Sequence, residues 1–317
     1  MRDFLSHGRV LMALLAGSMT AAAQAALHVP HAWRPLLIAS LGTFVIYNLN
    51  HLWDEREDEV NAPARRAWRA RFVSLWRGLM ALATVSGLVL AGSGGQRVLL
   101  LTLILVAIGL AYSIPWPIPA KANRRPSSEP LPTPCISSSP PPGERRGKGG
   151  EERLWDPSLR LKGKVGLNLA LIGAGWALTG VGLPLAETSA PLTLQAALMA
   201  LWIAGISGIL ATVFDLRDLP GDARAGLGTL AVLLGPAKAR RFLMGWCALS
   251  AATIVGAVAL GFFQAHILIA MLAPGAAFVW IARWPPGGST PGGYTDGLLL
   301  AEITISWLTT LVLRMSA

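Results

Sequence analysis

Long apolar runs, separated by short polar stretches, dominate the pattern of this chain. A helix needs about 20 mostly apolar residues to cross the hydrocarbon layer of a membrane. About nine runs approach this length, namely 9–28, 35–52, 72–92, 97–114, 165–184, 192–214, 240–262, 264–282 and 297–314. The pattern predicts an all-α protein, a polytopic transmembrane helical bundle of about nine spans with a central cavity.

The first run has two interpretations. Arg2 and Arg9 precede it, and Ala-Gln-Ala-Ala follows at 23–26. This arrangement fits a membrane span, and it also fits a cleavable signal peptide. Both readings of residues 1–28 stay open at this stage.

A polar segment at 115–160 interrupts the apolar pattern. It is rich in Pro, Ser and Gly, including Pro140-Pro141-Pro142, and carries charges of both signs. Such a composition buries too little apolar surface to order itself. We predict a disordered cytoplasmic insert, which divides the chain into 1–114 (spans one to four) and 161–317 (spans five to nine).

The positive charge indicates topology. The chain has 27 Lys and Arg against 17 Asp and Glu, a net charge of +10. The basic residues gather after spans two, four and six, with few in the opposite connections. The positive-inside rule then places these connections in the cytoplasm, with the N-terminus inside and the C-terminus outside. We therefore expect no nucleic-acid partner, but an integral protein of the cell (inner) membrane with cytoplasmic active-site loops.

Eight of the 17 carboxylates are grouped in two segments that follow spans two and six. The candidate metal ligands are Asn50, Asp54 and Asp58 in the first segment and Asp215, Asp218 and Asp222 in the second. Residues four apart share a helix face, and carboxylates near a membrane usually handle ions or substrates. A solvated helix end with alternating charges is the alternative for the first segment. In the second, Pro220-Gly221 predicts that the helix ends or bends.

If the two segments face each other, the sequence predicts a Mg²⁺ site, because Mg²⁺ prefers carboxylate oxygens together with substrate phosphates. We expect Mg²⁺ to be the cofactor and a diphosphate to be the ligand.

At this point the sequence resembles the UbiA superfamily of membrane prenyltransferases. The resemblance rests on Asn50-x-x-x-Asp54-x-x-x-Asp58 after span two and Asp218-x-x-x-Asp222 after span six. Two extensions strengthen it: Asn61-x-Pro63-x-Arg65 after the first motif, and Gly226 with Thr229-Leu230 after the second. His51 departs from the Asp that many relatives carry, and the insert separates Tyr112 from its expected partner Lys162, for which Lys121 is a rival.

The resemblance implies transfer of an isoprenyl group from a polyprenyl diphosphate to an aromatic or other lipophilic acceptor, within membrane lipid. The residues with a catalytic role would be Asp54, Asp58, Asp218, Asp222 and Tyr112. The Tyr112 ring would stabilise an allyl cation; its alternative role is to anchor the chain at the membrane interface. Those that hold the diphosphate would be Arg65, Lys162 and Arg224. The alternatives are terpene cyclisation, which some members of the superfamily carry out, and a non-enzymatic transporter.

A transporter is expected to carry ionisable residues within its spans. Glu302 is the main such residue here, and we expect it to pair or to snorkel to the cytoplasmic surface. A phosphatidyl-alcohol transferase is disfavoured, because Leu219 follows Asp218 where that family has a further motif residue.

Overall fold

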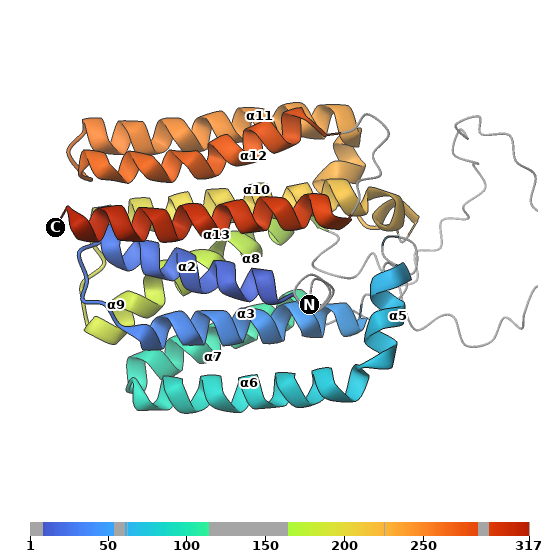
Figure 1. The fold of residues 1–317 in the computed structure, drawn as a ribbon, viewed down its shortest axis with the longest axis horizontal. Helices are drawn as coiled ribbons and strands as arrows, with labels where there is room; N and C mark the ends of the chain where they lie inside the picture. Colours follow the sequence, from blue (N-terminus) through green and yellow to red (C-terminus); the bar gives the residue numbers. More distant parts are fainter. Residues whose placement is uncertain are drawn as a thin grey trace, which may run out of the picture.

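Long helices packed side by side form the whole of the described structure (Figure 1). This computed structural model describes residues 9–53, 61, 63–113, 164–224, 226–284 and 292–316. The helices are α2 (Val10–Ala26), α3 (Trp33–Trp53), α5 (Pro63–Arg71), α6 (Val73–Ser93), α7 (Gln96–Ser113), α8 (Val165–Ala177), η4 (Leu178–Gly182), α9 (Leu183–Thr188), α10 (Leu194–Arg224), α11 (Leu230–Ala259), η5 (Ala265–Met271), α12 (Leu272–Ala282) and α13 (Gly292–Met315). The prediction of an all-α bundle is confirmed.

The helices also have the length and composition of membrane spans. Seven stretches of the described residues are long and apolar enough to cross a membrane. The apolar helix α2 is shorter, with 17 residues, and α3 has 21 residues but carries polar side chains near both ends. These helices coincide with the apolar runs of the sequence. The chain is an integral membrane protein.

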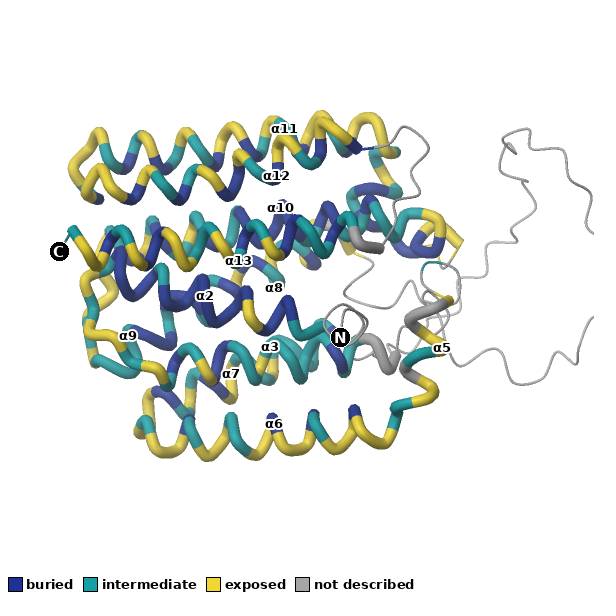
Figure 2. Tube along the Cα trace, in the orientation of Figure 1, coloured by how far each residue is buried: buried dark blue, intermediate teal, exposed yellow. Residues whose placement is uncertain are grey.

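Helix α2 lies at the centre of the bundle. It packs against α3 and α13, and it is almost wholly buried (Figure 2). Gly17 permits the close approach of α2 to α3, because a Cβ there would lie 2.5 Å from Ser40 Oγ. In this structure α2 is part of the core, as the interpretation of 9–28 as a span requires.

One end of the bundle brings together the segments that follow the predicted catalytic spans. Helices α3, α7 and α10 end there, α8 begins there, and α5 lies beside this end (Figure 1). At the opposite end Arg34 of α3 forms an ion pair with Glu187 of α9, with 2.5 Å between Nη1 and Oε1. The two acidic segments can therefore meet at the end of the bundle where α3, α7 and α10 finish, which we call the polar end.

Helix α10 corrects one expectation about the second acidic segment. The helix does not end at Pro220-Gly221 but continues to Arg224, with Pro220 inside it. Proline removes one backbone donor, but here it does so in the last turns, where a helix is about to end. Residues 218 and 222 thus remain one helical turn apart.

Helix α11 begins earlier than its apolar run at 240–262 predicts. It starts at Leu230, behind an N-cap in which Thr229 Oγ1 accepts a hydrogen bond from Val232 N at 3.4 Å. A kink at Gly235, where φ is +71°, precedes Pro236. Glycine adopts this conformation without steric cost. The kink therefore joins two helical segments of α11 without an intervening loop.

Candidate functional site

A large apolar cavity lies between α3, α6, α7 and α8. Its volume is about 490 Å³, within the range of small-molecule sites, which are mostly apolar with a few placed polar groups. The apolar lining includes Ile38, Leu49, Met80, Leu105, Ile108 and Leu171. The cavity is therefore suited to a long hydrocarbon group.

Two of the predicted site residues line this cavity. Asn50, the first residue of the first motif, lies near the end of α3, and Tyr112 lies near the end of α7. Both belong to the polar end of the bundle. Deeper in the wall, Trp176 Nε1 donates a hydrogen bond to the Tyr47 hydroxyl at 3.4 Å and connects α8 to α3. The cavity thus has a polar mouth and an apolar interior.

A hydrogen bond between described residues connects the segments that carry the two acidic motifs. Gly221 N donates to Asn61 Oδ1 at 2.7 Å, across 160 positions of sequence. Asn61 follows Asp58 by three positions, and Gly221 directly precedes Asp222. A Cβ on residue 221 would lie 2.2 Å from Asn61 Nδ2, so only glycine permits this contact. Residue 61, which follows the first motif in sequence, is therefore anchored beside the second motif.

Asp218 is held by its sequence neighbour. Arg217 donates from Nε to Asp218 Oδ1 at 2.7 Å and from Nη2 to Oδ2 at 2.6 Å. Arg217 Nη1 also donates to Thr295 Oγ1 of α13 at 3.1 Å. Paired guanidinium–carboxylate contacts of this kind fix geometry as well as charge. Arg217 therefore orients the Asp218 carboxylate and links it to α13.

Asp222 is the most deeply placed carboxylate of the second motif, with 3% of its surface exposed. An ionised carboxylate in such a place is costly unless donors or a cation compensate it. Arg224, two residues later, is exposed on the last turn of α10. The second motif thus has a buried carboxylate, Asp222, and two residues later an exposed cationic side chain, Arg224.

The predicted magnesium ligands are only partly described. Among the described residues no group of three or more His, Cys, Asp or Glu side chains can hold a metal ion. Asp54 and Asp58 lie outside the described residues. Amide and carboxylate oxygens are the donors that Mg²⁺ prefers, and the Asn61–Gly221 bond connects the segments that carry them.

Several other predicted residues also lie outside the part of the chain that is described. These are Lys121, Lys162 and the whole insert, and the side chains of His51 and Arg65 are likewise not described. The chain enters the described region again at Lys164, which forms a parallel backbone bridge with Gly228. Residue 164 therefore lies beside the loop that follows the second motif.

The sequence allows two roles for Arg217, pairing with the carboxylates or holding phosphate oxygens, and in the structure it pairs with Asp218. Two other residues that organise this site had no role in the sequence analysis. Asn61 appeared there only as part of a motif extension. Thr295 is 1% exposed and lies far from either motif in sequence, so no local signal pointed to it.

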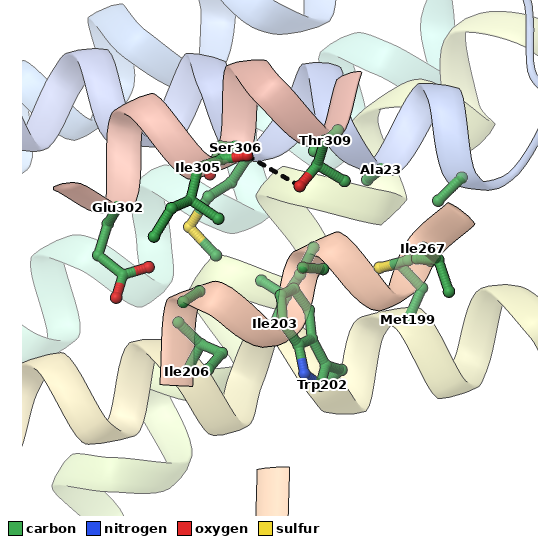
Figure 3. A pocket seen from close by; sticks show the side chains of 15 residues that line it. Ala23, Met199, Trp202, Ile203, Ile206, Ile267, Glu302, Ile305, Ser306 and Thr309 are labelled. Carbon is green, nitrogen blue, oxygen red and sulfur yellow. Dashed lines mark hydrogen bonds between the residues drawn. The ribbon is translucent and has the colours of Figure 1, made fainter. Parts of the chain in front are cut away.

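Glu302 corrects another expectation. It is 2% exposed, so it does not snorkel, and its Oε1 has no hydrogen-bond partner among the described residues. It lines a second cavity of about 20 Å³ together with Trp202, Ser306 and Thr309 (Figure 3). That is room for about one water molecule, far less than the apolar cavity offers.

Comparisons with known proteins agree with this architecture. Residues 157–287 match the family model of the UbiA prenyltransferase family. This match includes the second motif but not the first. No curated protein matches the sequence.

The fold is similar to that of solved UbiA homologues. One, from Archaeoglobus fulgidus and bound to GPP and Mg²⁺, is 14% identical with a TM-score of 0.61, covering 98% of this chain and 99% of that chain. Another, from Aeropyrum pernix K1, is 14% identical with a TM-score of 0.56, covering 95% of each chain. A structure described as digeranylgeranylglyceryl phosphate synthase is 13% identical with a TM-score of 0.53, covering 100% of this chain and 99% of that chain. The resemblance indicated by the two motifs is confirmed.

Proposed function

Because the chain resembles the UbiA superfamily in its motifs and fold, we propose that it is an integral-membrane prenyltransferase. It would move an isoprenyl group from a polyprenyl diphosphate to an aromatic or other lipophilic acceptor. The observation that carries the proposal is the Asn61–Gly221 bond. It ties the acidic segments together at the end of the bundle where Asn50 and Tyr112 line the apolar cavity.

In this proposal the two motifs share the metal. Magnesium would be held by Asn50, Asp54, Asp58, Asp215, Asp218 and Asp222. When bound, it supplies Lewis-acid stabilisation of the departing diphosphate. Arg217 keeps the Asp218 carboxylate in a fixed orientation for this task.

Positive side chains at the same end would hold the diphosphate. Arg65, Lys162 and Arg224 are the candidates, and charges set in place before the reaction stabilise a leaving anion without reorganisation. Tyr112 lines the cavity near its mouth, where its ring would face the allylic carbon. The rest of the isoprenyl chain would lie among α3, α6, α7 and α8, in the apolar cavity.

The comparisons support this substrate class. A similar fold was solved with GPP and Mg²⁺ and another with DMAPP and Mg²⁺. The proposal also accounts for the placement of Asp218 and Asp222 in the last turns of α10, at the end of the bundle where Asn50 and Tyr112 lie. A transporter would need a polar path through the spans, and Glu302 faces a cavity of only about 20 Å³.

The test is Mg²⁺-dependent release of diphosphate from an isoprenyl diphosphate by the purified protein in detergent. We expect release that EDTA abolishes and added Mg²⁺ restores. Asp54→Ala and Asp218→Ala should each lower the rate by about 100-fold or more, the usual effect of removing a stabiliser of developing charge. Release that requires an added acceptor supports transfer, whereas release without one favours cyclisation. A protein that releases no diphosphate under any of these conditions contradicts the proposal.

A further inference from the structure

We propose that Ser113 and Asn168 form a binding site for the hydroxyl group of the acceptor, which makes the acceptor a lipophilic alcohol or phenol. This inference rests on the proposed function, since it names the chemical class of the acceptor for that site. It follows from two buried polar side chains that have no hydrogen-bond partner among the described residues.

Both side chains are almost completely buried at the polar end of the bundle. Ser113 is the last residue of α7 and is 3% exposed, and Asn168, near the start of α8, is 2% exposed. Neither Ser113 Oγ nor Asn168 Oδ1 has a hydrogen-bond partner in the part of the chain that the structure describes. Buried polar groups are nearly always hydrogen-bonded, and one that is left unpaired costs free energy. A bound group that supplies both missing partners removes this cost.

The hydroxyl of Ser113 differs from those of other buried residues in the bundle. Thr102, on the same helix, donates from Oγ1 to Val98 O at 2.8 Å. Ser207 of α10 donates from Oγ to Ile203 O at 2.8 Å. Such bonds return the hydroxyl to the backbone of its own helix. Ser113 Oγ makes no such bond, so its hydroxyl is available to a ligand.

Both side chains continue the cavity-lining faces of their helices toward the polar end. On α7 the apolar cavity is lined by Val106 and Gly109, and Ser113 comes four residues after Gly109. On α8 the cavity is lined by Ile172, and Asn168 comes four residues before it. Residues four apart lie on the same face of a helix. The pair therefore lies one turn beyond the apolar lining, on the same two faces.

The packing of α7 against α8 places the two side chains at nearly the same level along the bundle axis. A Cβ on Gly175 would lie 4.0 Å from Ile108 Cγ2, so these two residues share a level. Helix α7 ends at the polar end and α8 begins there (Figure 1), so Ser113 is level with residue 170. Asn168 is two residues, or ~3 Å, from that level. One small group bound between the two helices at this level would meet both side chains.

The chemistry of the pair favours a neutral hydroxyl. Asn168 Oδ1 is an acceptor and needs a donor, whereas the hydroxyl of Ser113 can donate. An O–H group donates one hydrogen bond and accepts others, so it satisfies both atoms at once. An ionised diphosphate or carboxylate has no donor and would leave Asn168 Oδ1 unpaired. The pair is therefore suited to the acceptor and not to the isoprenyl diphosphate.

The level of the pair also matches an acceptor. A Cβ on Gly109 would lie 2.5 Å from Ile46 Cδ1, so α3 and α7 are level at these residues. Both helices run toward the polar end (Figure 1). Four residues later on each helix, Asn50 and Ser113 therefore share a level. A hydroxyl bound by Ser113 would lie beside the mouth of the apolar cavity, where the proposed magnesium ligand Asn50 is placed.

The test compares acceptors that differ only in the hydroxyl hydrogen. The purified protein in detergent receives geranyl diphosphate, Mg²⁺ and either naphthol, dihydroxynaphthalene or dodecanol, and in parallel the methyl ether of each. We expect at least one hydroxylated compound to raise the rate of diphosphate release. Its kcat/KM should exceed that of its ether by at least about tenfold, because a site that binds O–H rejects an analogue that leaves its polar groups unpaired.

Variants of the pair identify the residues that bind the hydroxyl. Ser113→Ala and Asn168→Leu should each raise the KM for that compound by about fivefold to tenfold relative to the KM for geranyl diphosphate, the usual effect of one lost hydrogen bond. Ser207→Ala is the matched control. Ser207 is also 3% exposed, but its hydroxyl is paired within α10 and it does not line the apolar cavity. The KM values of this control should match those of the unaltered protein.

Thermal unfolding gives a measurement that needs no acceptor. An unpaired buried hydroxyl costs free energy in the folded protein, so Ser113→Ala should be at least as stable as the unaltered protein. A lower melting temperature in this variant would show that Ser113 Oγ has a partner within the chain, and it would overturn the inference.

Three kinetic results also overturn the inference. These are equal use of the hydroxylated compounds and their ethers, failure of all three hydroxylated compounds to raise the release of diphosphate, and unchanged KM values in both Ser113→Ala and Asn168→Leu. A water molecule as the only occupant of the site would give the last of these results. Absence of Mg²⁺-dependent release under every condition in the unaltered protein overturns the proposed function instead.

Discussion

At the scale of single residues, Gly221 decides whether the two acidic segments can meet. Its amide donates to Asn61 Oδ1 at 2.7 Å, and a Cβ would lie 2.2 Å from Asn61 Nδ2. Gly221→Ala should therefore destabilise the protein by about 1–3 kcal/mol, the usual cost of overpacking, and should lower activity. Thermal unfolding in detergent measures the first effect and diphosphate release the second.

The matched control for this change is Gly245→Ala. Gly245 lies within α11, and a Cβ there would meet no atom within 4 Å. The same substitution should stabilise the protein there by up to about 1 kcal/mol through helix propensity. If Gly221→Ala is as stable and active as Gly245→Ala, the contact between the segments contributes neither to stability nor to activity.

Arg217 gives a second prediction at this scale. Its two contacts with Asp218 and its contact with Thr295 depend on the planar guanidinium, which lysine does not reproduce. Arg217→Lys should raise the Mg²⁺ concentration required for half-maximal activity by about 10- to 100-fold, as loss of a partner that orients a metal ligand does. Arg241→Lys, at an exposed position on α11, should leave it unchanged. Equal Mg²⁺ requirements in both variants would show that Arg217 does not orient a ligand.

At the scale of helices, hydrophobic length predicted the spans well because it reports the contact of each segment with lipid or with other spans. It did not predict how far α10 and α11 extend beyond the apolar runs. There the continuation of α10 through Pro220 coincides with a hydrogen bond that Gly221 N donates to Asn61 Oδ1. Helix α11 begins at the cap formed by Thr229. Such contacts are tertiary or polar, so the hydrophobic pattern of the sequence does not predict them.

The end of the bundle opposite the site gives a prediction of pH dependence. His31, between α2 and α3, has its Nδ1 at 2.5 Å from Arg314 Nη2 of α13 and near Gln24 of α2. Partial burial, and then the positive charge of Arg314, lower the pKa of His31 below its ordinary value of 6.5. The unfolded chain therefore takes up this proton first as the pH falls, and stability decreases below about pH 6.5.

Thermal unfolding between pH 7.5 and pH 5.5 measures this contribution. We expect His31→Gln to reduce the loss of stability over this interval, because the titrating group is then absent. A loss of equal size in His31→Gln and in the unaltered protein would assign the pH dependence to other groups.

At the scale of the whole molecule, the sequence indicated which acidic residues to consider but not how distant segments join around them. The spacing of the motifs indicated the acids, but the joining of residues 61 and 221 and the anchoring of Arg217 by Thr295 depend on how α10, α13 and the first motif pack. The expectation that Glu302 snorkels to the surface was also wrong, because the depth of its side chain depends on the rotation of α13. Local sequence does not specify these relations between distant segments.

The central claim is that both acidic segments bind one divalent metal site together with diphosphate. The most direct measurement is binding of Mn²⁺, as a paramagnetic substitute for Mg²⁺, to the purified protein with pyrophosphate, followed by electron paramagnetic resonance. We predict saturable binding that Asp58→Asn and Asp222→Asn each weaken by about 100-fold or more, because even partners that only orient ligands contribute 10- to 100-fold. Binding that survives unchanged when either segment loses its carboxylate would contradict the account.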